Sequence, residues 1–236
     1  MKATLRAPFF EIGAKNYMFG ERLLEVAKKA DACAIKNDID VIFICPYTDI
    51  RLITQATKRL LVFAPYMDSL RAGRGLADIL PEGIKAAGAS GVMLNHSERP
   101  MSLESLEETI ARASELDLLT LVCAGSVAQA RAVACLSPDI INPEEATLIG
   151  SGSVSDADFV KHTTDVIQTI NSKIYVEHAA GITSGDEVRE LILKGAQGVG
   201  VASGIFMADD PLAKVEEMIQ AVRETMDRRK GYENNK

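Results

Sequence analysis

Short apolar runs rich in β-branched residues recur along the chain and alternate with longer segments of helical period. The runs lie at residues 8–12, 40–45, 60–64, 91–94, 118–123, 139–141, 173–176 and 198–201. Strands that are apolar on both faces and alternate with helices are typical of a parallel sheet that helices cover. The pattern therefore predicts an α/β protein with eight strands.

The segments between the runs have the spacing of amphipathic helices. Residues 21–36 place one apolar stripe opposite the charged positions, and this stripe consists of Leu24, Ala27, Ala30 and Ile35. In residues 103–116 we expect the charged side chains to face water, namely Glu104, Glu107, Glu108 and Arg112. Residues 187–194 and 211–228 repeat the helical pattern.

Eight βα units of roughly 30 residues each fit a closed (β/α)8 barrel better than an open doubly wound sheet. No GxGxxG motif follows the first strand, which argues against a dinucleotide-binding fold. Neither a linker nor a shift in composition divides the chain. We therefore expect a single barrel domain over residues 1–236, with a polar, frayed tail from about residue 229.

The charge and the cysteine pattern exclude several classes of protein. A net charge of −7 gives no basic field for nucleic acid or an anionic membrane. No run reaches the ~18–20 apolar residues of a membrane span, and the N-terminus lacks the apolar core of a signal peptide. The four cysteines form no CxxC pair and no zinc-ligand spacing, so we expect buried thiols, no metal and a cytoplasmic protein.

In a barrel of this kind, the chemistry gathers at the C-terminal ends of the strands. This rule selects Lys15 after the first strand, His96 after the fourth and Glu144 after the sixth. A lone histidine is also compatible with a structural role, but Ser97 and Glu98 follow His96 directly. There, backbone N–H groups and the dipole of the next helix would lower the imidazole pKa and keep the ring neutral.

Acidic residues and a glycine-rich stretch follow the sixth strand. Glu144 and Glu145 come first, then an apolar bridge, then Gly150, Ser151 and Gly152. The stretch fits either a solvated loop or a carboxylate base followed by a hinged lid, and both interpretations stay open on the loop alone. A lid would exclude water from an enediolate intermediate.

Small residues also end the seventh and eighth strands, at residues 179–185 and 202–204. They let backbone N–H groups approach a ligand, and a phosphate at this place in a barrel binds a helix N-terminus. Together the two stretches therefore indicate a phosphate-binding site. Lys15 would neutralise the charge of a phosphorylated substrate.

Together these motifs resemble the triosephosphate isomerase family. The segment VMLNHSER is similar to the family's histidine signature, and EEATLIGSG is similar to its glutamate-and-lid signature, E-P-x-x-x-I-G-T-G. The resemblance covers nearly the whole chain, and AAGITSGDEVRELILKGAQGVGVASGIF is similar to the compact archaeal members. It implies a cofactor-free aldose–ketose isomerase of glycolysis and gluconeogenesis, which interconverts dihydroxyacetone phosphate and glyceraldehyde 3-phosphate.

The resemblance also implies a role for each candidate residue. Glu144 is the base that moves a proton between C1 and C2, His96 is the neutral electrophile, and Glu98 orients Lys15. The residues implied to hold the phosphate are Gly150, Ser151, Gly181, Ala202 and Ser203. Family members associate through the loop at residues 66–76, which predicts a homodimer or a homotetramer.

Several positions depart from the family pattern. Gly13 replaces the asparagine of the Asn-x-Lys motif at a substrate-binding position, and Glu145 replaces the proline after the base. The doubled glutamate leaves open which of Glu144 and Glu145 is the base, although the spacing to the lid favours Glu144. Pro100 replaces an arginine. His178 stands where a small or sulfur-bearing residue is expected, which makes it a candidate for facing the substrate.

These departures cluster at the reactive end of the substrate. They raise an alternative substrate, a four-carbon ketose phosphate such as erythrulose phosphate in polyol catabolism, because Gly13 leaves room for one more carbon. A non-catalytic barrel that binds a sugar phosphate is a further alternative. Such a protein has no need for a proton-abstracting glutamate.

Overall fold

The computed structural model describes residues 1–144 and 157–233. Eight parallel strands close into a barrel in chain order, with β1 hydrogen-bonded to both β2 and β8. The strands are β1 (Phe9–Gly13), β2 (Val41–Ile44), β3 (Leu61–Ala64), β4 (Gly91–Leu94), β5 (Leu119–Ala124), β6 (Ile140–Pro143), β7 (Tyr175–His178) and β8 (Gly198–Val201). The predicted (β/α)8 barrel is confirmed.

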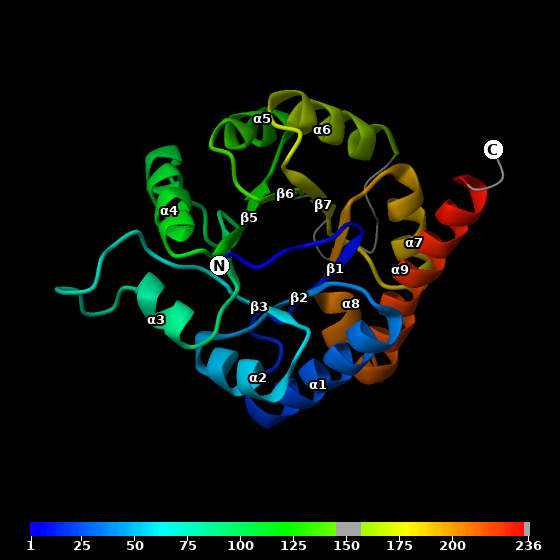
Figure 1. The fold of residues 1–236 in the computed structure, drawn as a ribbon, viewed down its shortest axis with the longest axis horizontal. Helices are drawn as coiled ribbons and strands as arrows, with labels where there is room; N and C mark the ends of the chain where they lie inside the picture. Colours follow the sequence, from blue (N-terminus) through cyan, green and yellow to red (C-terminus); the bar gives the residue numbers. More distant parts are fainter. Residues whose placement is uncertain (145–156, 234–236) are drawn as a thin grey trace.

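Helices connect the strands and surround the barrel (Figure 1). They are α1 (Gly20–Asn37), the 3-10 helix η1 (Tyr47–Asp49), α2 (Ile50–Ala56), α3 (Pro81–Ala86), α4 (Leu103–Glu115), α5 (Val127–Cys135), α6 (Ala157–Ile170), α7 (Gly185–Lys194), α8 (Ser203–Phe206) and α9 (Pro211–Glu233). Most strand and helix boundaries differ from the sequence prediction by one or two residues, and two of the differences are informative. Helix α9 continues past residue 228 to Glu233, and β7 ends at His178 instead of Val176, because its last two residues are polar yet buried.

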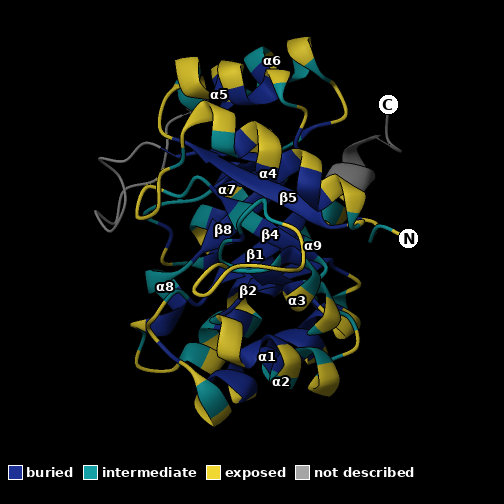
Figure 2. Ribbon diagram, turned by 90° about the vertical axis from the view of Figure 1, so that its left-hand side faces the viewer, coloured by how far each residue is buried: buried dark blue, intermediate teal, exposed yellow. Residues whose placement is uncertain are grey.

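Two apolar cores lie on the two sides of the sheet. A smaller cluster, which includes Phe9, Phe63 and Leu121, fills the barrel interior, and the larger one lies between the strands and the helices. In Figure 2 the strands are almost entirely buried, whereas the helices show one buried and one exposed side. Glycines make room for the interior rings, because a Cβ at Gly198 would lie 2.2 Å from the ring of Phe9.

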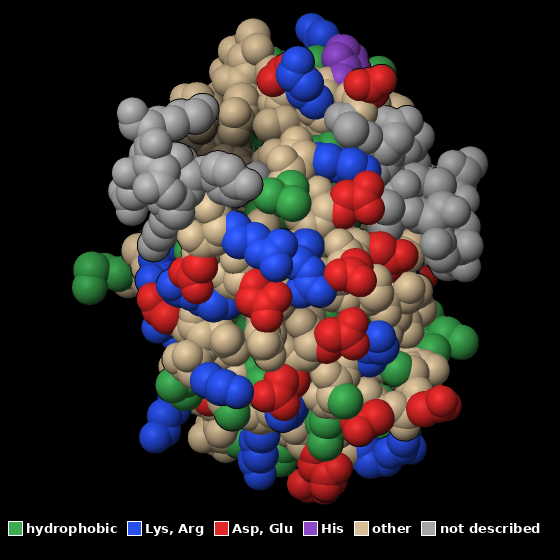
Figure 3. Space-filling model, turned by 90° about the vertical axis from the view of Figure 1, so that its right-hand side faces the viewer, with side chains coloured by type: hydrophobic (Ala, Val, Ile, Leu, Met, Phe, Trp, Pro, Cys, Tyr) green, Lys and Arg blue, Asp and Glu red, His purple; other side chains and the backbone are tan. Residues whose placement is uncertain are grey.

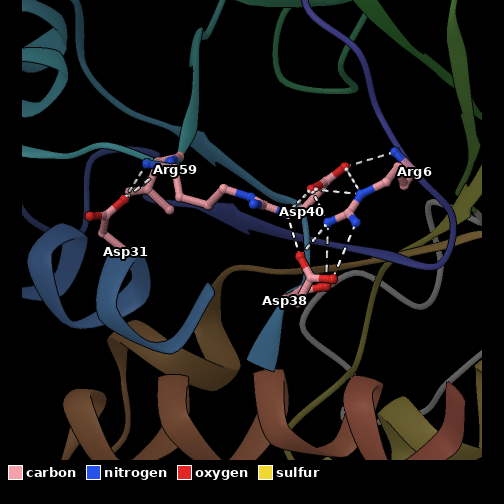
Figure 4. Close-up of polar contacts among 6 residues, drawn as sticks. Arg6, Asp31, Asp38, Asp40 and Arg59 are labelled. Carbon is pink, nitrogen blue, oxygen red and sulfur yellow. Dashed lines mark hydrogen bonds and ion pairs between the residues drawn. The ribbon is translucent and has the colours of Figure 1, made fainter. Parts of the chain in front are cut away.

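An ion-pair network closes the N-terminal end of the barrel (Figure 4). Arg6 and Arg59 both contact Asp38 and Asp40, with each of the four nitrogen–oxygen distances at 2.9 Å. Burial alone would raise the pKa of Asp40, but hydrogen bonds from Arg6 and Arg59 outweigh burial, and the pKa is lowered. The network ties together the segments that enter β1, β2 and β3.

The structure corrects three expectations about individual side chains. Arg112 does not face water: its side chain is 6% exposed and pairs with Glu82 and Glu115, because the segment between β3 and α3 folds over α4. Ile35 is exposed, since Ala34 takes the inward position in the last turn of α1. Among the four free cysteines, Cys135 is exposed at the end of α5.

The outer surface mixes charges of both signs. On the face that carries α7 and α9, acidic and basic side chains are interspersed (Figure 3), and several form ion pairs, such as Lys214 with Glu217 at 2.9 Å. In the part of the chain that the structure describes, no helix combines the length and the apolar character that crossing a membrane requires.

Candidate active site

A cavity of about 520 Å³ opens at the C-terminal ends of the strands. Its wall includes each described residue that the sequence selects for catalysis or substrate binding, namely Gly13, Lys15, His96, Glu98, Glu144, Gly181, Ala202 and Ser203. Gly150 and Ser151, the other two candidates, and Glu145 lie outside the described residues. The barrel therefore brings these candidate residues from five strand ends to one space.

Lys15 is held at the mouth of the barrel by its backbone and by one partner. Its φ of 43° lies in the left-handed region, which turns the chain sharply after β1. Its ammonium group contacts Glu98 Oε1 at 2.8 Å. The hydrogen bond from Lys15 lowers the pKa of Glu98, so the carboxylate stays charged and keeps the lysine over the cavity.

The loop after β4 presents His96 to the cavity. Asn95, with a φ of 55°, fixes this loop: its amide donates to the Cys123 carbonyl at 2.9 Å and accepts the Met101 N–H at 2.9 Å. The Glu98 N–H donates to Nδ1 of His96 at 3.1 Å. Because Nδ1 is an acceptor, the proton of the neutral ring lies on Nε2.

Burial lowers the pKa of His96, and the charge of Lys15 lowers it further. The expected backbone N–H contact is present, but the expected helix dipole is not the cause. A turn follows His96, and α4 begins only at Leu103 with Ser102 as its N-cap. The ring is therefore kept neutral by desolvation and by the neighbouring ammonium group.

Glu144 follows β6 directly, and its backbone N–H donates to the Ala124 carbonyl at 2.9 Å. The residue is 9% exposed and lines the cavity. Burial raises the pKa of Glu144, an effect that the charge of Lys15 partly offsets. A carboxylate in this setting is a stronger base than one in water.

The loops after β7 and β8 form the opposite wall. Ala180 and Gly181 have φ values of 81° and 71°, both in the left-handed region. The two loops pack closely, because a Cβ at Gly204 would lie 2.0 Å from the carbonyl oxygen of Ile182. Helix α8 begins at Ser203, directly after Ala202. Backbone N–H groups of these loops are available to an anionic ligand.

His178 does not line the cavity. It is fully buried, and its ring contacts the ring of Phe159 in α6 with the centroids 6.3 Å apart. Burial lowers the pKa of His178 to about 4. Successive strand residues point to opposite faces of a sheet, so His178 faces the helices and Glu177 faces the barrel interior.

Sequence reasoning missed two polar cavity residues on the strands themselves. Glu11 of β1 and Asn142 of β6 line the cavity, and both are buried. The only signal in the sequence was a charged residue, Glu11, inside the apolar run FFEIG. The run was interpreted as a strand, and Glu11 was not selected as a site residue. Arg99 also lines the cavity, with its guanidinium carbon 4.0 Å from the ring centroid of Tyr66.

Comparison with known proteins adds to this geometry. The triosephosphate isomerase family model matches residues 12–222. A triosephosphate isomerase of Methanobacterium bryantii is 34% identical over 227 residues, which cover 94% of this chain and 100% of that protein. The enzyme of Sulfurisphaera tokodaii is 34% identical over 96% of this chain and 100% of its own length. The chain therefore belongs to the triosephosphate isomerase family and is an aldose–ketose isomerase.

Proposed function

We propose that the enzyme interconverts dihydroxyacetone phosphate and glyceraldehyde 3-phosphate through an enediolate, with Glu144 as the base. The observation that carries this proposal is the meeting of a buried carboxylate, a neutral imidazole and an ammonium group in one cavity. The relatives are named triosephosphate isomerases, and this name supports the choice of a three-carbon substrate.

In this mechanism Glu144 removes a proton from C1 of the ketose and returns it to C2. Its raised pKa makes it a competent proton acceptor, because burial destabilises the charged form. His96 Nε2 donates a hydrogen bond to the carbonyl oxygen and stabilises the enediolate, and Lys15 adds positive charge beside it. This division of roles is that of the family to which the chain belongs.

The phosphate would bind the opposite wall, on the backbone N–H groups of Gly181, Ala202 and Ser203. Left-handed backbone at residues 180 and 181 exposes such groups toward the cavity. Gly150 and Ser151 complete the phosphate site in this proposal, as part of a lid that excludes water. No metal or other cofactor takes part in the proposed steps.

The proposal is tested by kcat/KM for triose phosphates on the purified enzyme and on three variants. We expect Glu144→Gln to lose about 10²–10⁴-fold, the usual contribution of a general base. Glu144→Asp retracts the carboxylate and should lose less than Glu144→Gln. Glu145→Gln is the matched control, and full activity there assigns the base to Glu144. Loss in Glu145→Gln with retention in Glu144→Gln would reverse the assignment.

A four-carbon ketose phosphate is the second candidate substrate. It rests on Gly13, which places no side chain in the cavity, whereas the relatives give it no support. The same assay with erythrulose phosphates separates the two. A kcat/KM for triose phosphates a thousandfold below that for erythrulose phosphates would refute the first choice.

We also propose that the enzyme is a homodimer or homotetramer, joined through the loop at residues 66–76. This loop projects beyond α3 and α4 (Figure 1), and Leu76 is fully exposed. The base of the loop is tied to α4, because Arg71 pairs with Glu115 at 2.7 Å and Ser69 donates to Glu108 at 3.3 Å. Sedimentation of the purified protein tests the association.

Phosphorylated sugars are retained inside cells by their charge, so we propose a cytoplasmic location. Three buried, free cysteines agree with a reducing compartment. Fractionation of cells with an antibody against the chain tests this location.

A further inference from the structure

Two buried carboxyl groups lie below the catalytic residues and have no part in the mechanism above. Glu11 on β1 and Glu177 on β7 point into the barrel interior and converge on Gly200 of β8. A Cβ at Gly200 would lie 2.5 Å from Glu11 Oε2 and 2.3 Å from Glu177 Oε1. The absence of a side chain at Gly200 is therefore what allows both carboxyl groups to occupy this level of the barrel.

Four oxygen atoms of these carboxyl groups and of one neighbouring amide lack hydrogen-bond partners within the described part of the chain. Glu11 Oε1, both carboxyl oxygens of Glu177 and Asn142 Oδ1 are buried and have no hydrogen-bond partner among residues 1–144 and 157–233. Polar atoms buried in this way are destabilising unless something pairs with them. Glu11 is 4% exposed and Asn142 is 3% exposed, and both line the active-site cavity. Glu11 and Asn142 thus border the cavity and each carry a buried polar atom without a partner among the described residues.

The position of Glu11 relates to the glycine above it. A Cβ at Gly13 would lie 3.0 Å from Glu11 Oε1, so the carboxyl group borders the space that a side chain at Gly13 would fill. Glu11 precedes Gly13 on β1, and Asn142 precedes Glu144 on β6, in each case by one inward-facing position. Glu11 therefore lies one layer deeper in the barrel than Gly13, and Asn142 lies one layer deeper than the base Glu144.

The environment favours the protonated form of both carboxyl groups. Burial raises the pKa of Glu11 well above its ordinary value, and the nearby Glu177 and Glu144 raise it further. Burial, followed by Glu144, raises the pKa of Glu177 to about 8. A protonated carboxyl group has one O–H donor and one carbonyl acceptor, which is the complement that a sugar hydroxyl needs. Among the described residues, no group of acidic, histidine and cysteine side chains is arranged to hold a metal ion.

We propose that Glu11 and Asn142, supported from behind by Glu177, form a hydroxyl-binding subsite at the floor of the cavity. Its ligand is the hydroxyl group at the end of the sugar phosphate opposite the phosphate. This inference rests on the proposed function only in placing the phosphate at the loops after β7 and β8. It assigns to Glu11 a contact with the substrate at the position where Gly13 offers none.

The test is a binding cycle between one hydroxyl of the ligand and one carboxyl of the protein. The ligands are glycerol 3-phosphate and propane-1,2-diol phosphate of matched configuration, which lacks only the terminal hydroxyl. Neither has a carbonyl group, so neither is turned over, and calorimetry gives both dissociation constants. The wild-type enzyme should prefer glycerol 3-phosphate about tenfold, the effect of one well-placed hydrogen bond.

Three variants test whether the preference for glycerol 3-phosphate depends on the side chain of Glu11. Glu11→Leu should reduce it to less than about twofold, while Glu11→Gln, which keeps a donor and an acceptor, should retain it. Thr120→Val is the matched control, because Thr120 is a buried polar strand residue that does not line the cavity. The control should retain the full preference.

Equal dissociation constants of the two ligands on the wild-type enzyme would by themselves overturn the proposal, because the subsite then does not exist. An unchanged preference in Glu11→Leu would also overturn the proposal. Failure of the subsite and failure of the proposed function are distinguishable. Turnover of triose phosphates with no hydroxyl preference would overturn only the subsite, whereas a Glu11-dependent preference without turnover would support the subsite and overturn only the function.

Discussion

Glu177 provides a direct test of the buried carboxyl groups through the stability of the enzyme. Its pKa is raised from an ordinary 4.5 to about 8 by burial and by Glu144. Between these two values the folded protein holds a proton that the unfolded chain has lost, so stability falls as the pH rises. The fall is about 1.4 kcal/mol per pH unit, which amounts to about 3 kcal/mol between pH 4.5 and pH 7.

The variant Glu177→Gln removes the titrating group and nearly keeps the side-chain volume. We define the stability gap as the free energy of unfolding of the variant minus that of the wild type. This gap should increase by about 3 kcal/mol from pH 4.5 to pH 7. Urea unfolding at fixed protein concentration and at several pH values measures this gap, and contributions from groups that do not interact with Glu177 cancel.

A matched control is Glu190→Gln on α7, where the side chain is 54% exposed and pairs with Lys194 at 2.7 Å. Its gap to the wild type should stay constant over the same pH range, because an exposed pair of this kind contributes little. A constant gap for Glu177→Gln would refute the reasoning, since the Glu177 carboxyl would then be ionised in the folded state.

Two further predictions concern the ends of the barrel. Asp40→Asn removes a carboxylate that pairs with Arg6 and Arg59 and should cost about 2 kcal/mol at neutral pH. Because the folded-state pKa of Asp40 is lowered, this difference should be full above about pH 4 and vanish as the pH falls through that lowered pKa; an equal loss at pH 2 would contradict it. Arg112→Leu removes the contacts of α4 with Glu82 and the Leu70 carbonyl, together with the Arg112–Glu115 pair within the helix. It should weaken self-association at least tenfold in sedimentation experiments, whereas Arg131→Leu on α5, which lies elsewhere on the surface, should not. Equal association constants for the two variants would show that the loop at residues 66–76 needs no support from α4.

Much of the candidate site followed from sequence order. Lys15, His96 and Glu144 each come directly after an apolar run, and parallel strands of a barrel bring such positions to one end. Their convergence on one cavity needed only the correct number of strands. The cause of the lowered His96 pKa could not be predicted from the sequence, because the sequence does not show that a turn separates His96 from α4.

The sequence by itself determined the alternation of strands and helices, and hence the barrel and the order of the candidate residues around its mouth. Only the tertiary structure decided which strand residues point inward. Strands that are buried on both faces have no polar alternation, so the side-chain period cannot distinguish interior from exterior. Barrel closure placed Glu11 and Glu177 inside and turned His178 toward Phe159 and the helices. The same kind of long-range contact buried Arg112 beneath a loop that lies far from it in the chain.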